Sequence, residues 1–68
     1  MTKGNLTNKH EAVIDALKKE HLTSFQILNK VKSISLILVV YTIIDELKKM
    51  GLIKSYIKED IKYHYCIA

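Results

Sequence analysis

The spacing of apolar residues along this 68-residue chain predicts three helices followed by two strands. Apolar residues three and four positions apart cover one face of a helix, whereas a period of two is typical of a strand. The helical spacing runs over residues 8–20, 23–32 and 35–50, and the alternation over residues 53–58 and 61–67. We therefore expect a mainly α domain of the α+β class, with three helices and a small terminal β-hairpin.

The first predicted helix, residues 8–20, has two alternative N-caps. Asn8 followed by Glu11 makes a capping-box pattern, and Thr7 is an equally good cap. The apolar stripe of this helix consists of Val13, Ile14, Ala16 and Leu17. Residues 1–6 are expected to form a flexible tail.

The second predicted helix has the sharpest start signal in the chain. Thr23 and Gln26 form a capping box, and Leu22 and Ile27 occupy the two positions of a hydrophobic staple. The apolar face is expected to continue through Phe25, Leu28 and Val31.

The third predicted helix competes with a strand, because residues 36–44 are rich in β-branched side chains. Two features favour the helix. Its apolar residues recur at helical spacing, namely Val40, Ile43, Leu47 and Met50. Gly51 stands where a left-handed C-terminal cap belongs, which sets Leu52 against Leu47. Ser35 is the expected N-cap.

Two alternating segments around the polar pair Glu59-Asp60 predict a hairpin. In the first segment Ile53, Ser55 and Ile57 alternate with Lys54, Tyr56 and Lys58. In the second segment Ile61, Tyr63, Tyr65 and Ile67 alternate with Lys62, His64 and Cys66. A helix-turn-helix followed by such a wing is a winged-helix domain, which here spans residues 1–68 and usually binds DNA.

Composition narrows the class of protein. A chain of this length buries only about 60% of its unfolded surface, so its fold is marginally stable unless it is well capped or oligomeric. Residues 36–44 are too short for a membrane span, and the N-terminus has no signal-peptide pattern. One cysteine, Cys66, excludes an internal disulfide. We expect a cytoplasmic protein that does not associate with a membrane.

The formal net charge is +4, and all eleven basic residues are lysine. A modest positive charge suits attraction to phosphates, although it is also ordinary for a soluble surface. Because arginine is the best bidentate donor to guanine, any reading of base sequence must use other side chains.

These motifs resemble the N-terminal DNA-binding domain of the ferric uptake regulator family of bacterial metal-dependent repressors. The resemblance rests on Leu6-Thr7, Ala12-Val13-Ile14-Asp15-Ala16-Leu17, His21-Leu22-Thr23, Val40-Tyr41, Leu47, Gly51-Leu52-Ile53 and the tyrosines of the second strand. It implies a winged helix whose third helix enters the major groove while the wing touches the backbone or the minor groove. It does not extend to the family's dimerisation and metal-sensing domain.

The third helix departs from the family pattern. The family typically reads Ser-x-Ala-Thr-Val-Tyr-Arg, and this chain reads Leu36-Ile37-Leu38-Val39-Val40-Tyr41-Thr42. Among the polar contacts only Tyr41 remains, and Thr42 replaces the arginine. We therefore expect a transcriptional regulator that binds double-stranded DNA, with weak base selectivity as a monomer, and that acts as a dimer.

In this hypothesis Tyr41 contacts a phosphate or a thymine methyl, and Thr42 contacts a base edge or methyl. The lysines expected to contact the phosphates are Lys30, Lys32, Lys54, Lys58 and Lys62. The alternative is that these lysines form an ordinary solvated surface.

A second hypothesis is a protein-interaction module. Ile37, Leu38 and Tyr41 are expected to face away from the core side of the third helix, and an exposed apolar patch usually marks an interface. The patch then binds a second copy, as a homodimer, or a partner regulator. The remaining alternative is that the hairpin or the N-terminal tail covers it.

Metal binding and catalysis are not expected. His21 stands at the position of a metal-binding histidine in many members of the resembling family, and His64 and Cys66 share one face of a strand. A structural zinc needs four ligands, and these three do not obviously converge. For catalysis, His64 and Cys66 on an exposed terminal strand make a poor nucleophile site, and the hairpin is expected to offer no pocket. No cofactor is predicted.

Overall fold

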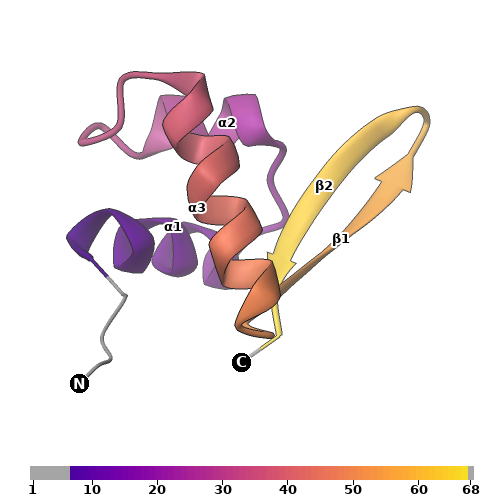
Figure 1. Ribbon diagram of the computed structural model, residues 1–68. Coiled ribbons are helices and arrows are strands. Elements are labelled where there is room, and N and C mark those ends of the chain that lie inside the picture. Colours follow the sequence, from indigo (N-terminus) through magenta and orange to yellow (C-terminus); the bar gives the residue numbers. More distant parts are fainter. Residues whose placement is uncertain (1–6, 68) are drawn as a thin grey trace.

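A computed structural model describes residues 7–67 of the chain and contains three helices followed by a two-stranded antiparallel sheet. The elements are α1 (Asn8–Lys19), α2 (Ser24–Lys30), α3 (Ile37–Lys49), β1 (Ile53–Lys58) and β2 (Ile61–Cys66). Figure 1 shows the helices grouped together and the hairpin projecting from them. The predicted fold class is confirmed: the chain has the winged-helix layout of a mainly α domain. The predicted tail, residues 1–6, lies outside the described residues.

Helix α1 is capped by Thr7, and the alternative box of Asn8 with Glu11 is wrong. The Thr7 hydroxyl accepts a hydrogen bond from the backbone N–H of His10, and the His10 ring accepts one from the backbone N–H of Thr7. The helix ends one residue before the predicted boundary, because the backbone of Glu20 is extended.

Helix α2 starts as predicted. Gln26 N–H donates to the Thr23 hydroxyl over 3.2 Å, and Thr23 N–H donates to the Gln26 side chain over 2.9 Å. Both staple residues, Leu22 and Ile27, are buried. The helix ends at Lys30, short of residue 32, because the next residue is extended and buried.

The sequence predicts that Phe25 continues the apolar face of α2, but its side chain is 61% exposed. It stands two positions before the buried Ile27, which places the two side chains on nearly opposite sides of the helix. The prediction for Phe25 is therefore wrong.

Helix α3 is a helix and not a strand, but it begins later than predicted. Leu36, with an extended backbone, occupies the N-cap position without a side-chain hydrogen bond, so the prediction of Ser35 as N-cap is wrong. The C-terminal end is as expected. Gly51 has a φ of 78°, its N–H donates to the Lys48 carbonyl, and Leu52 N–H donates to the Leu47 carbonyl, which is a Schellman motif.

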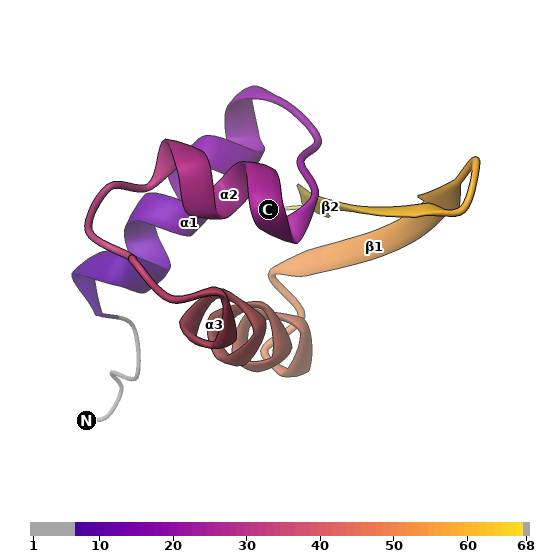
Figure 2. The ribbon, with the colours of Figure 1, turned by 90° about the horizontal axis from the view of Figure 1, so that it is seen from above.

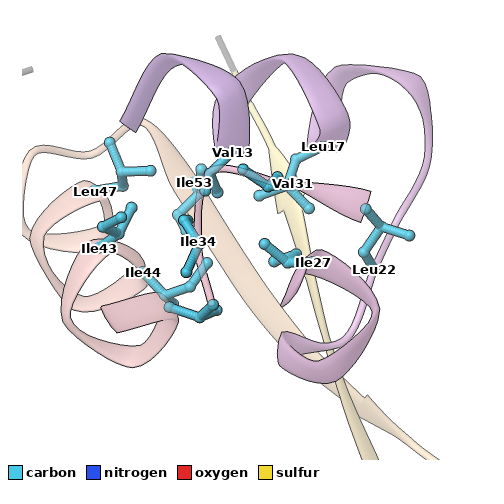
Figure 3. Close-up of a cluster of buried hydrophobic side chains, with 11 residues drawn as sticks. Val13, Leu17, Leu22, Ile27, Val31, Ile34, Ile43, Ile44, Leu47 and Ile53 are labelled. Carbon is cyan, nitrogen blue, oxygen red and sulfur yellow. The ribbon is translucent and has the colours of Figure 1, made fainter. Parts of the chain in front are cut away.

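The core lies between the three helices and the base of the hairpin (Figure 3). Its buried members are Val13, Leu17, Leu22, Ile27, Val31, Ile34, Val40, Ile43, Ile44, Leu47 and Ile53. Ile37 is half-buried against this cluster, so the prediction that it faces outward with Leu38 and Tyr41 is wrong for Ile37. It stands three and seven residues before Val40 and Ile44, and so lies on their side of the helix.

The hairpin has one face toward the helices and one face away from them. In the observed register Ser55 pairs with His64 and Tyr56 pairs with Tyr63. His64 is buried, so the inward face is the one with His64, Ser55 and Cys66 and not the one with the tyrosines. The second strand ends at Cys66 and does not reach residue 67.

A backbone bridge attaches the hairpin to the loop between α1 and α2. Leu22 N–H donates to the His64 carbonyl over 3.1 Å, and His64 N–H donates to the Leu22 carbonyl over 2.7 Å. Hydrogen bonds as well as packing therefore set the direction of the hairpin relative to the helices. Figure 2 shows the hairpin projecting to one side of the three helices. Within residues 7–67, no helix has both the length and the apolar character that a membrane span requires.

Candidate nucleic-acid interface

The hairpin, α3 and the start of α2 surround a groove of about 530 Å³. Its lining residues are Thr23, Ser24, Phe25, Tyr41, Ile44, Asp45, Lys48, Asp60, Ile61, Lys62 and His64. The expectation that a terminal hairpin offers no pocket is wrong, because the hairpin is held beside α3 instead of extending alone into solvent.

One side of the groove is the exposed face of α3. Tyr41, Asp45 and Lys48 follow one another at spacings of four and three, so they lie in a row on the helix surface. Tyr41 is 45% exposed. Lys48 is not among the lysines that the sequence predicts to contact phosphates, although its seven-residue spacing from Tyr41 is a signal that both share one face of the helix.

The charges within the groove are mixed. Lys48 and Lys62 line it together with two carboxylates, Asp45 and Asp60. The Asp45 carboxylate also lies 3.1 Å from the Lys49 ammonium one turn later. The groove therefore combines two cations that can meet phosphates with two anions that repel them.

At the base of the groove, His64 joins the hairpin to α2. The Ser24 hydroxyl lies 3.0 Å from Nε2 of His64, and the Ser55 hydroxyl lies 2.6 Å from Nδ1. Both ring nitrogens are thus hydrogen-bonded, as a buried imidazole requires. The network positions β2 against the first residue of α2.

The His64 ring is only 4% exposed. Burial, as the largest cause, and the positive charges of Lys48 and Lys62 together lower the pKa of His64 from 6.5 to about 4. The imidazole is therefore neutral at neutral pH. Its role in the structure is to accept one hydrogen bond and donate another between the two serines.

The structure does not bring the five predicted phosphate-binding lysines together. Lys62 alone among them lines the groove. Lys54 and Lys58 occupy the opposite face of the hairpin, as the strand alternation requires. Lys30, at the far end of α2, lies 3.1 Å from the Glu20 carboxylate. Lys32 is exposed in the turn that follows.

Thr42 and Leu38 lie along the other side of α3, beside α1. The Thr42 hydroxyl donates to the Leu38 carbonyl over 3.0 Å, which leaves its methyl group and lone pairs for a partner. Both residues line a second groove of about 330 Å³, where Nε2 of His10 lies 2.6 Å from the Glu46 carboxylate. Leu38 is 70% exposed and Leu36 is 64% exposed.

The outward face of the hairpin holds a cluster of rings that sequence reasoning did not identify. The Tyr56 hydroxyl is hydrogen-bonded to Nδ1 of His21 over 2.7 Å. The His21 ring stacks on Tyr65 with a centroid distance of 5.0 Å, and Tyr56 stacks on Tyr63 at 5.6 Å. The signal that could have found the cluster is the alternation itself, because it places these tyrosines on one face.

The weak metal candidates do not meet. His21 belongs to the outward face of the hairpin, whereas His64 and Cys66 belong to the inward face. Across residues 7–67, no group of three or more His, Cys, Asp or Glu side chains is placed to hold a metal ion.

The site is thus a winged-helix surface. A groove lined by both positive and negative side chains lies on one side of the wing, and a cluster of aromatic rings lies on the other. The likeness to the ferric uptake regulator family rests on sequence motifs alone, since a comparison of the chain with protein-family models, curated proteins and solved structures finds no match.

Proposed function

We propose that this protein binds double-stranded DNA through α3 and the hairpin, mainly by contact with the phosphates. The observation on which the proposal depends is the exposed row of α3 beside a projecting hairpin, with Lys48 and Lys62 on the two sides of the space between them. A helix and a wing in this relation fit the major groove and the neighbouring backbone. The formal net charge of +4 favours approach to a polyanion.

Base selectivity is expected to be weak. The outward residues in the first half of α3 are Leu38, Tyr41 and Thr42, which offer methyl and ring contacts but no bidentate donor. Lysine, the basic residue used throughout this chain, contacts phosphate as a point charge. Affinity should therefore depend more on salt than on sequence.

The test is fluorescence anisotropy with a labelled duplex at about 50 mM and about 200 mM salt. The logarithm of the affinity should fall with the logarithm of the salt concentration, with a slope of about −0.9 per phosphate contacted. Lys48→Gln and Lys62→Gln should each weaken binding and reduce that slope by about one.

Lys19→Gln is the matched control, because Lys19 ends α1 and does not line the groove. It removes the same charge and should change duplex affinity less than either groove variant. No binding at the lower salt concentration, or equal effects of all three substitutions, would contradict the proposed surface.

Self-association is a second candidate function, favoured by the exposure of Leu36 and Leu38 at the start of α3. Two large aliphatic side chains in solvent beside an apolar groove are typical of an interface. Of the alternative coverings, the hairpin does not reach this groove, whose described lining comes from α1, α3 and Thr7. The N-terminal tail lies outside the described residues.

Sedimentation velocity tests this candidate. If the patch is a dimer interface, the protein sediments as a dimer and Leu38→Lys converts it to a monomer with unchanged circular dichroism. A monomer at every accessible concentration, with or without the substitution, would exclude self-association.

A further inference from the structure

The outward face of the hairpin is a second surface with its own chemistry. We call it the ring face and define it by the aromatic side chains of His21, Tyr56, Tyr63 and Tyr65 with the lysines Lys54 and Lys58. The register pairs Tyr56 with Tyr63 and Lys54 with Tyr65, which places these side chains on the face opposite Ser55 and His64. It is thus separated by the sheet from the groove proposed to meet duplex DNA.

The rings of this face are held in place. Tyr56 is tilted against Tyr65 at a centroid distance of 5.8 Å and meets His21 edge to face at 5.4 Å. The hydrogen bond between the Tyr56 hydroxyl and His21 links the hairpin to the segment before α2. A partner that stacks on these rings therefore meets a surface that is already ordered, so binding loses less side-chain entropy.

The ring surfaces are only partly covered by one another. Tyr56 and Tyr63 are within 22° of parallel, yet their centroids are 5.6 Å apart. Planes in van der Waals contact lie about 3.5–4 Å apart, so the two rings are offset and each leaves part of its face uncovered. Tyr56 remains 37% exposed.

The charge on this face is uniformly positive. Lys54 and Lys58 flank Tyr56 on the same side of β1 and are exposed. On the second strand, the side chains of this same face are Ile61, Tyr63 and Tyr65. Neither strand therefore places a carboxylate on this face. Rings between lysines complement a ligand with flat bases and an anionic backbone.

We propose that the ring face binds unpaired nucleotides of single-stranded nucleic acid, which stack on Tyr56 and Tyr63 while Lys54 and Lys58 contact the phosphates. Bases in a duplex are already stacked and cannot offer their faces to these rings, so the ligand differs from that of the α3 groove. DNA and RNA single strands share this chemistry. Sequence preference is expected to be low, because every base has a stacking face.

The intrinsic fluorescence of the protein provides a direct readout. The chain has no tryptophan and four tyrosines, of which three belong to the ring face and the fourth is Tyr41 on α3. Titration with oligothymidylate of about 12 nucleotides should quench this fluorescence as bases stack on the rings. Tyr41→Phe removes the emission of the other tyrosine, and the quenching should persist in that variant.

The decisive variants are Tyr63→Leu and Tyr63→Phe. Leucine keeps an apolar contact but removes the ring, so single-strand affinity should fall at least about fivefold, whereas phenylalanine should bind like the unsubstituted protein. Circular dichroism checks that both variants fold. Oligouridylate in a parallel titration distinguishes RNA from DNA as the preferred source of the strand.

Duplex affinity measured on the same variants separates this proposal from the proposed function. Loss of single-strand binding in Tyr63→Leu with unchanged duplex binding supports the ring face, whether or not the α3 groove binds duplex. Absence of quenching, equal single-strand affinity of Tyr63→Leu and the unsubstituted protein, or an equal loss of duplex affinity would overturn it.

Discussion

Two histidines, His10 and His64, are the buried polar side chains among residues 7–67, and each joins two elements. His10 lies 2.7 Å from the Thr7 hydroxyl and 2.6 Å from the Glu46 carboxylate, so it connects α1 to α3. His64 connects the hairpin to α2 through two serines. A buried imidazole costs free energy unless both nitrogens are paired, and here both rings are fully paired.

The lowered pKa of His64 makes stability depend on pH. The unfolded chain has the ordinary His pKa of 6.5, and the folded chain has a pKa of about 4, so the unfolded state binds more protons between these values. The free energy of unfolding should therefore be highest above about pH 6.5 and fall as the pH drops toward about 4, by about 3 kcal/mol in total. Urea unfolding across this range measures the loss.

His64→Gln is the control for that measurement. Glutamine can hydrogen-bond both serines and does not titrate. In this variant, most of the decrease in the free energy of unfolding between about pH 6.5 and about pH 4 should therefore be absent. An identical pH dependence in the two proteins would show that other groups, and not His64, cause the loss.

At the scale of single elements, α3 shows what the sequence could and could not predict. The residue spacing and Gly51 correctly favoured a helix over the strand that β-branched residues suggest. The predicted start of α3, with Ser35 as N-cap, was wrong. An N-cap is worth about 1 kcal/mol, which is less than the free energy gained by burying Ile34, whose side chain is 3% exposed. The backbone is still extended at Leu36, one residue past Ser35.

For the candidate site, the alternation of the hairpin was predictable but its inward face was not. The two strands give opposite signals, because the tyrosine positions are the more apolar ones in the second strand, whereas Ile53 and Ile57 alternate with lysines in the first. His64 faces the helices because Leu22, Ser24 and Ser55 satisfy its backbone and ring. These partners lie up to 42 residues away in the chain. The groove is unpredictable for the same reason, since it depends on how α2, α3 and the hairpin are placed relative to one another.

The turn of the hairpin offers a stabilising substitution. Glu59 and Asp60 both have positive φ, 54° and 67°, as a type I′ turn requires, although Asn-Gly is the preferred pair at these positions. The double substitution Glu59→Asn with Asp60→Gly should raise the free energy of unfolding by about 1 kcal/mol, or the melting temperature by roughly 4–8 °C.

Thermal unfolding followed by circular dichroism provides the measurement. Glu59→Ala is the comparison, because it removes a charge without improving the left-handed conformation. A gain as large in Glu59→Ala as in the double variant would mean that charge, and not backbone strain, limits the turn.

At the scale of the whole molecule, the two faces of the hairpin belong to two different surfaces of the protein. The inward face contributes Ile53 to the core and bounds the α3 groove with His64, while the outward face presents stacked rings between lysines. A two-stranded hairpin alone is marginally stable, so the Leu22 bridge and the serine network are what allow both faces to be ordered. The proposed functions therefore depend on contacts outside the hairpin.

Placement of charge, more than its total, should decide duplex affinity. Asp45 stands between Tyr41 and Lys48 on the α3 row, where a phosphate would approach. Asp45→Asn removes this repulsion and the ion pair with Lys49. Duplex binding at low salt should therefore become about fivefold tighter, which corresponds to a gain of about 1 kcal/mol in binding free energy. Anisotropy with the labelled duplex measures this change in affinity.

Asp15→Asn on α1 is the control. It changes the net charge equally but lies outside the groove, so its effect on duplex affinity should be smaller. Equal gains in both variants would mean that net charge alone attracts the DNA and that α3 does not face it.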